Sequence, residues 1–421
     1  MSRAQSDAGI RLDLLRVTLS LLLLISPEFK YGLASLKEPG ALGAAPYGFG
    51  WVVKLIGPSV ALGEFSLYLI YIGALCGLLG VFARVGLTAA ALGQFFLIGW
   101  LQMRGATVHC HHLLWLTVTL ACVPSADCLS LGKRPSLTYG SRYRFGLGVC
   151  SALIAMLFFF PGLHKLLKGG WAWFSGETLY HTTLWKAAQY WDKTLPISFD
   201  DQLSYLPLAW GAVIFELSAP LLLLWWRRVG LFVALALSFH VGTALLLNIK
   251  FTNLWPCYVV FLPWERWLTH LLPAREVRAQ MASRWRSTEL LLIPLCLGIT
   301  LSGISMKIDA WPFACYPTFH QKISLEMPLL SVQVHDARGE VRRLDYKRLQ
   351  RPNNQSWGET WRLAGFYSKF NVEPLLLYGR SRVMPLLNTD DKVVMFYRSV
   401  LNTKSGEVKD QRLLLKWVIN Q

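Results

Sequence analysis

Long apolar runs constrain the fold of this 421-residue chain more than any other feature. A helix needs about 17–25 predominantly apolar residues to cross a bilayer alone. Nine runs are candidate spans: residues 12–26, 65–82, 85–101, 107–123, 145–163, 206–226, 229–247, 254–271 and 290–305. The first is short and the eighth contains prolines and charged residues, so either could instead be re-entrant. With 53% hydrophobic and 16% charged residues, the sequence predicts a mainly α-helical, polytopic membrane bundle of about nine spans.

Basic residues between the runs predict how the helices are oriented. Lys and Arg in short loops mark the cytoplasmic side, and here they cluster before the first run and after the second, fourth, sixth and eighth. With nine spans and a cytoplasmic N-terminus, all these clusters fall on one side and the C-terminal tail is extracytoplasmic. No small-x-small cleavage site follows residues 12–26, so we expect this run to be retained. The net charge of +17 follows from this topology and predicts no nucleic-acid partner, because the basic residues form no continuous stripe.

The tail after about residue 310 differs in character from the rest of the chain. Residues 331–346, SVQVHDARGEVRRLDY, read as two strands around Ala337-Arg338-Gly339. Residues 393–419 read as two more strands around Ser405-Gly406. The sequence thus predicts a transmembrane domain over 1–309 and a small β-rich extracytoplasmic domain over 310–421, in which we find no catalytic motif.

An unusual segment, FFFPGLHKLLKGGWAWFSGETL at 158–179, lies at the end of the fifth run. It places His164 and Lys165 where the chain leaves the membrane. Aromatic and cationic side chains also gather at bilayer interfaces simply as anchors. An ionisable group at membrane depth is nevertheless a candidate functional group.

Two further ionisable residues, Glu216 and His240, lie inside the sixth and seventh runs at similar distances from the Arg227–Arg228 turn. In an antiparallel helix pair they reach similar depths and could face each other. A carboxylate in lipid is costly, so we expect a partner or a polar cavity. The pair is either functional or a lock between two helices.

Histidines 109, 111 and 112 in the sequence HCHH do not predict a metal site. Successive residues of a helix point about 100° apart, and no carboxylate-rich set stands nearby. We expect one of these histidines to be a hydrogen-bonding or acid–base group. The eight cysteines form no CxxC pair, so we expect no disulfide framework and no bound metal.

Three segments together resemble one known family. They are the 158–179 segment, residues 215–242 (FELSAPLLLLWWRRVGLFVALALSFHVG) and residues 110–120 (CHHLLWLTVTL). The chain resembles the vitamin K-dependent γ-carboxylase family and its bacterial relatives with the horizontally transferred transmembrane (HTTM) domain. The similarity covers roughly residues 10–305 and the junction at 311–319.

The resemblance implies roles for particular residues. Lys165 occupies the position of the catalytic base, and His112 would stabilise an anion or intermediate. His111 stands where the family has an asparagine. This departure from the family pattern concerns the residue expected to act in the oxygen or carbanion step. Weaker assignments to the substrate and quinone site fall on His111, His164, Glu216, His240 and Trp171.

The implied reaction couples epoxidation of reduced vitamin K, or a related hydroquinone, by O2 to carboxylation of glutamate with CO2, a lyase-class chemistry without a metal. Lysine can accept the phenolic proton only where burial disfavours its ammonium form. The implied partners are a glutamyl protein or peptide on the outer face and a quinone reductase, and the implied location is a bacterial inner membrane. The tail is much shorter than the luminal part of the animal enzymes, which recognises substrate propeptides.

A non-enzymatic alternative stays open. Some HTTM relatives take part in peptide or toxin maturation, so the same scaffold could serve a maturation, binding or transport factor. A quinone-binding redox subunit is a third hypothesis, against which the lack of haem or flavin motifs counts. An enzyme should lose its activity in Lys165→Ala, whereas a non-enzymatic factor should change little.

Overall fold

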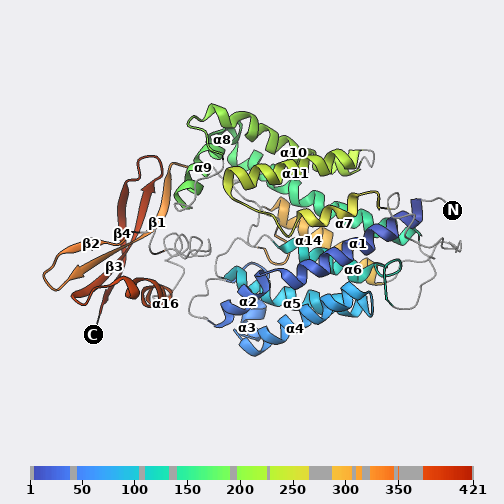
Figure 1. The fold of residues 1–421 in the computed structure, drawn as a ribbon, viewed down its shortest axis with the longest axis horizontal. Coiled ribbons are helices and arrows are strands. Elements are labelled where there is room, and N and C mark those ends of the chain that lie inside the picture. Colours follow the sequence, from blue (N-terminus) through green and yellow to red (C-terminus); the bar gives the residue numbers. More distant parts are fainter. Residues whose placement is uncertain are drawn as a thin grey trace.

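The computed structural model describes residues 4–37, 45–103, 110–131, 140–189, 197–224, 228–264, 287–305, 310–314, 323–345, 349 and 373–419. The fold is mostly helical, with a bundle of long helices and a small antiparallel sheet. The sheet lies at one end of the bundle and the N-terminus at the opposite end, while the C-terminus belongs to the sheet (Figure 1). The predicted topology, with the two ends of the chain on opposite sides of a membrane and the N-terminus cytoplasmic, stays a prediction.

Five helices of the described residues are long and apolar enough to cross a membrane. They are α4 (Val60–Leu79), α5 (Ala83–Met103), α7 (Gly140–His164) with the π-helical turn that follows it, α10 (Leu206–Leu224) and α11 (Val229–Leu247). Each coincides with a predicted run, so the prediction of a helical membrane protein is confirmed to this extent. The prediction of nine spans is not confirmed.

The other four predicted runs differ from full-length apolar spans. Helix α1 (Ala4–Ile25) is long but carries buried charged residues. Helices α6 (His111–Cys122) and α14 (Leu292–Ile304), the latter preceded by α13 (Ser287–Leu290), are apolar but short. A helix of this length rises only about 20 Å, against a hydrocarbon core of about 30 Å. The eighth run forms a 3₁₀ helix (Trp255–Phe261), and its residues beyond Trp264 lie outside the described part.

Small residues let neighbouring helices approach closely, as membrane helices require. A Cβ added to Gly73 of α4 would lie 2.2 Å from the carbonyl oxygen of Gly86 in α5. One added to Gly93 would lie 2.4 Å from the Ser66 carbonyl oxygen. The backbones of α4 and α5 therefore touch along a glycine-lined seam.

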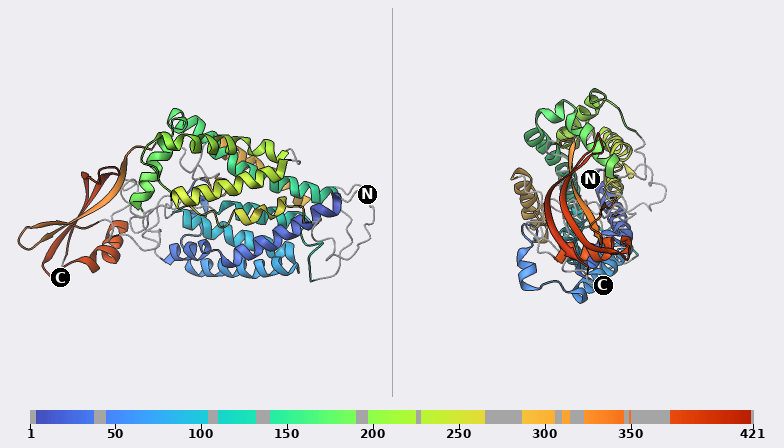
Figure 2. Two further views of the ribbon diagram at one scale, coloured as in Figure 1. Left: turned by 45° about the horizontal axis from the view of Figure 1, so that its top comes forward. Right: turned by 90° about the vertical axis from the view of Figure 1, so that its left-hand side faces the viewer.

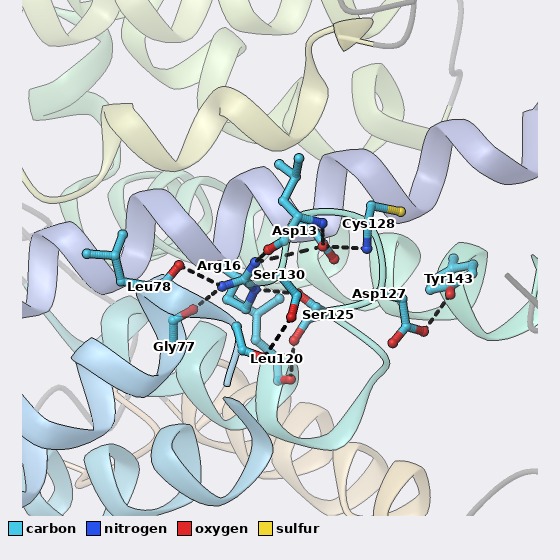
Figure 3. Close-up of polar contacts among 12 residues, drawn as sticks. Asp13, Arg16, Gly77, Leu78, Leu120, Ser125, Asp127, Cys128, Ser130 and Tyr143 are labelled. Carbon is cyan, nitrogen blue, oxygen red and sulfur yellow. Dashed lines mark hydrogen bonds and ion pairs between the residues drawn. The ribbon is translucent and has the colours of Figure 1, made fainter. Parts of the chain in front are cut away.

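A buried ion pair in α1 holds the end of the bundle that lies away from the sheet (Figure 3). The guanidinium of Arg16 donates to the carbonyls of Gly77 and Leu78 at the end of α4, and to those of Ser125 and Leu129 in the loop after α6. The Asp13 carboxylate accepts the main-chain N–H groups of Cys128 (2.8 Å) and Leu129 (2.5 Å). Arg16 and Asp13 thus provide hydrogen-bond partners for main-chain carbonyl and N–H groups at the end of α4 and in the loop after α6. This role explains why two charged residues lie in an otherwise apolar run.

Four antiparallel strands make up the sheet, in the order β2-β1-β3-β4. They are β1 (Glu326–Asp336), β2 (Val341–Arg343), β3 (Asp391–Asn402) and β4 (Val408–Val418). Both predicted hairpins are present, and their turns use glycines at positive φ, Gly339 (+84°) and Gly406 (+74°). One face of the sheet packs on α16 (Glu373–Tyr378) through Val332, Phe396 and Tyr378.

Contacts at two places join the sheet and the segment before it to the bundle. Helix α9 (Glu177–Gln189) lies beside β1 (Figures 1 and 2), where the Trp185 indole donates to the Ser324 carbonyl at 2.8 Å and packs near Met327 and Leu329. Trp311, in the segment before the sheet, is buried, and its indole donates to the Phe95 carbonyl at 3.1 Å. The chain thus enters the sheet from an anchored point on the bundle. The predicted domain boundary at residues 309/310 stays a prediction.

Candidate functional site

The Lys165 side chain is buried at the point where α7 ends. Pro161 lies within α7, and after His164 the chain makes a π-helical turn (Lys165–Gly169) that Gly170 ends at φ +51°. In this turn the Lys165 side chain is buried, with 4% exposed, whereas Lys168 is exposed. Single π-helical turns often mark functional sites, because they turn a side chain away from the direction that a regular helix gives it.

Lys165 is paired with a carboxylate deep in the bundle. Its Nζ donates to Oε1 of Glu216 in α10, and both side chains are buried. The second carboxylate oxygen, Oε2, has no hydrogen-bond partner among the described residues. The amine also lies over two aromatic rings, 5.0 Å from the centroid of Trp173 and 6.0 Å from that of Phe239. The pair is therefore enclosed mainly by apolar groups, where electrostatic interactions are strong.

Gly162 makes this pairing possible. A Cβ at this position would lie 2.8 Å from the Cβ of Glu216 and 3.2 Å from the main-chain nitrogen of Leu217. Without a side chain at residue 162, α7 and α10 approach closely just before Lys165. The absence of a side chain at Gly162 thus allows the helix packing that brings Lys165 to Glu216.

His240 in α11 lies in an aromatic enclosure near this pair. Its Nε2 is 2.6 Å from the Tyr258 hydroxyl, and the two rings stack at 17° with centroids 5.8 Å apart. Phe158, Phe239 and Phe251 also contact the imidazole. Its Nδ1 has no hydrogen-bond partner among the described residues. The sequence left open whether Glu216 and His240 face each other. In the structure Glu216 is bonded to Lys165, and His240 is bonded to Tyr258.

The remaining candidate histidines lie in different surroundings. His112 is buried at the start of α6, where its Nε2 donates to the main-chain carbonyl of Asn253 at 2.8 Å. Asn253 lies two residues after Phe251, whose ring contacts the His240 imidazole. His111 packs between the rings of Trp115 and Trp311. His164 donates from Nε2 to the Gly303 carbonyl at 2.7 Å. Of this group, His112 is thus the histidine that is bonded to the segment carrying Phe251, which contacts His240. His109 lies outside the described residues.

Trp173, and not Trp171, is the tryptophan that lies against Lys165. Trp171 is 77% exposed, whereas Trp173 is 3% exposed. Both belong to the single turn of α8 (Trp171–Phe174), in which residues two apart point to nearly opposite sides. Sequence reasoning missed Trp173, Tyr258 and Asn253. The helical spacing of 171 and 173 is the one signal that could have separated the two tryptophans.

Within the described ranges no group of three or more His, Cys, Asp or Glu residues is arranged to hold a metal ion. Comparisons of the chain with protein-family models, curated proteins and solved structures give no match. The fold and the site define the chain as a helical membrane protein with a buried lysine–glutamate pair and a histidine–tyrosine pair. The ring of Phe239 lies between them, because it contacts both Lys165 and His240.

Proposed function

We propose that the chain is an integral membrane enzyme of the kind that the vitamin K-dependent γ-carboxylases represent. It would use a reduced quinone, O2 and CO2 to carboxylate glutamyl side chains of a protein or peptide on the outer face of a bacterial inner membrane. In this proposal the helical part is an HTTM domain with a cytoplasmic N-terminus, the sheet is extracytoplasmic, and a quinone reductase supplies the reduced quinone. The observation that carries the proposal is the buried Lys165–Glu216 pair between α7 and α10.

The side chains around this pair suit the ring of a reduced quinone. Trp173 and Phe239 offer apolar contacts to a flat ring. Glu216 Oε2 and His240 Nδ1 are buried polar atoms without partners among the described residues, and hydroxyl groups of a ligand could satisfy them. When bound, the quinol would be oxidised by O2 to its epoxide, with water as the second product. This oxidation would provide the base that removes a γ-proton of the glutamyl side chain, and CO2 would then add to the γ-carbon.

Lys165 and Glu216 act together as the acceptor of a phenolic proton. Two coupled groups titrate as a unit, and a buried carboxylate is costly to keep charged. The pair takes up one proton when the Glu216 carboxylate becomes a neutral carboxyl group. The ammonium of Lys165, released from its counter-ion, then stabilises the negative oxygen that the proton has left. His240 and Tyr258 help to orient the ring, and the aromatic side chains keep water away.

The test uses detergent-purified protein supplied with reduced vitamin K, O2, labelled bicarbonate and a glutamate-rich peptide. Wild type is expected to form epoxide and to fix label, and Lys165→Ala is expected to lose both by at least about 10²-fold, the lower range for acid–base catalysis. Lys168→Ala is the matched control, because this exposed lysine lies in the same π-helical turn.

The outcomes separate the hypotheses. Epoxide without fixed label would mean a quinol oxygenase with another acceptor. If folded wild type forms neither product, the proposal is wrong and the non-enzymatic membrane factor becomes the better hypothesis. Equal activity of wild type and Lys165→Ala would remove Lys165 from the mechanism.

A further inference from the structure

One hydrogen bond determines which nitrogen of His112 carries a proton. The Nε2 atom lies 2.8 Å from the main-chain carbonyl oxygen of Asn253. A carbonyl oxygen only accepts, so Nε2 carries a hydrogen whether the ring is neutral or charged. In the neutral ring the lone pair therefore belongs to Nδ1. Neutral His112 can accept a hydrogen bond or proton through Nδ1, but it cannot donate through that atom.

The carbonyl that fixes His112 is itself held by a polar cluster. The Asn253 side-chain amide donates to Glu28 Oε1 at 2.9 Å and to Ser26 Oγ at 3.3 Å. The Ser26 hydroxyl in turn donates to Glu28 Oε2. These partners lie at the corner between α1 and α2 (Glu28–Lys37), far from Asn253 in the sequence. The segment between α11 and the 3₁₀ helix is thereby tied to the first helices of the chain.

The position of His112 makes its protonation relevant to the site. The side chain is 1% exposed and lies in the first turn of α6. It is bonded to the segment in which Phe251, two residues before Asn253, contacts the imidazole of His240 at a centroid distance of 5.1 Å. A hydrogen bond to one ring nitrogen of a histidine fixes the tautomer and so defines whether the other nitrogen can donate or accept.

We propose that Asn253, anchored by Glu28 and Ser26, is a positioning residue that fixes His112 in its Nε2–H form, so that neutral His112 serves the site as a hydrogen-bond or proton acceptor through Nδ1. The resemblance to the γ-carboxylases suggested a stabiliser of anions, which would require a donor. The catalytic consequence rests on the proposed function, whereas the tautomer does not.

The tautomer is measured directly by ¹⁵N NMR of purified protein labelled at its nine histidines. The His112 signals are those that disappear in His112→Gln. Wild type is expected to show a protonated Nε2 and an unprotonated Nδ1, and Asn253→Ala is expected to give a mixture of tautomers. Thr252→Ala is the control, because this neighbour in the same turn is exposed. A wild-type ring protonated at Nδ1, either alone or together with Nε2, overturns the proposal.

The second test separates the acceptor role from the structural role. In His112→Gln the side-chain amide can still donate to the Asn253 carbonyl, but the Nδ1 acceptor is gone. We expect this variant to fold with unchanged stability and to lose at least about 10²-fold in kcat for carboxylation. Full activity of His112→Gln contradicts the acceptor role. If wild type is itself inactive, the proposed function fails while the NMR measurement still decides the tautomer.

Discussion

Replacing Lys165 by Met tests whether the buried ion pair is as isolated from water as the structure indicates. Methionine keeps most of the volume of lysine, so the change removes the charge and leaves a small cavity. The Glu216 carboxylate then loses the partner of Oε1, and its Oε2 has no other partner among the described residues. The variant must therefore either keep an unpaired charge or protonate the carboxyl group.

The expected cost follows from the burial of both groups. The Lys165 and Glu216 side chains are 5% and 4% exposed, so solvent screening is small. Removing one member of such a pair costs about 3–5 kcal/mol, whereas replacing both by apolar residues of similar volume is often close to neutral. We therefore expect Lys165→Met and Glu216→Met each to lose about 3–5 kcal/mol of unfolding free energy, and the double variant to lose about 1–2 kcal/mol.

The free energies can be measured by SDS titration of the protein in mixed micelles, followed by tryptophan fluorescence. Lys168→Met is the matched control, and we expect it to lie within about 0.5 kcal/mol of wild type because Lys168 is exposed. A cost of less than about 1 kcal/mol in either single variant would mean that the pair is screened by water like a surface ion pair. A double variant that loses the sum of the two single costs would mean that the two charges are energetically independent.

Three other predictions concern the site, the buried Asp13–Arg16 ion pair of α1 and the sheet. Trp173→Ala should lower carboxylation about tenfold through lost cation–π and ring contacts, with the exposed Trp171→Ala as its control. Arg16→Met should lower the unfolding free energy by about 3–5 kcal/mol in the same titration, because Asp13 loses its counter-ion. Burial would raise the pKa of Asp410, but hydrogen bonds from Ser331 and Ser399 and the Arg343 charge hold it below its usual value. This stabilisation exists above the unfolded pKa of about 3.9 and is lost as pH falls through the lower folded value. Asp410→Asn should thus weaken amide-exchange protection of β3 and β4 at pH 7, with the difference from wild type vanishing in acid.

Local patterns allowed much of the fold to be predicted. The five long apolar helices coincide with predicted runs because lipid exposure requires one continuous apolar stretch. Both hairpins were predicted from alternating strands around turns that contain Gly339 and Gly406. The prediction of nine full spans went further than the described helices support. Residues 111–122 form only a short helix, and a 3₁₀ helix replaces part of the eighth run.

The sequence by itself determined the membrane-spanning character, the β-rich tail and the presence of ionisable groups at membrane depth, because these depend on runs and periodicities of neighbouring residues. Only the tertiary structure decided the partners of those groups. Lys165 meets Glu216 from 51 residues away, and His112 meets Asn253 from 141 residues away. Such pairings depend on how helices pack and how closely they approach, here through Gly162, and no local pattern in the chain encodes that distance.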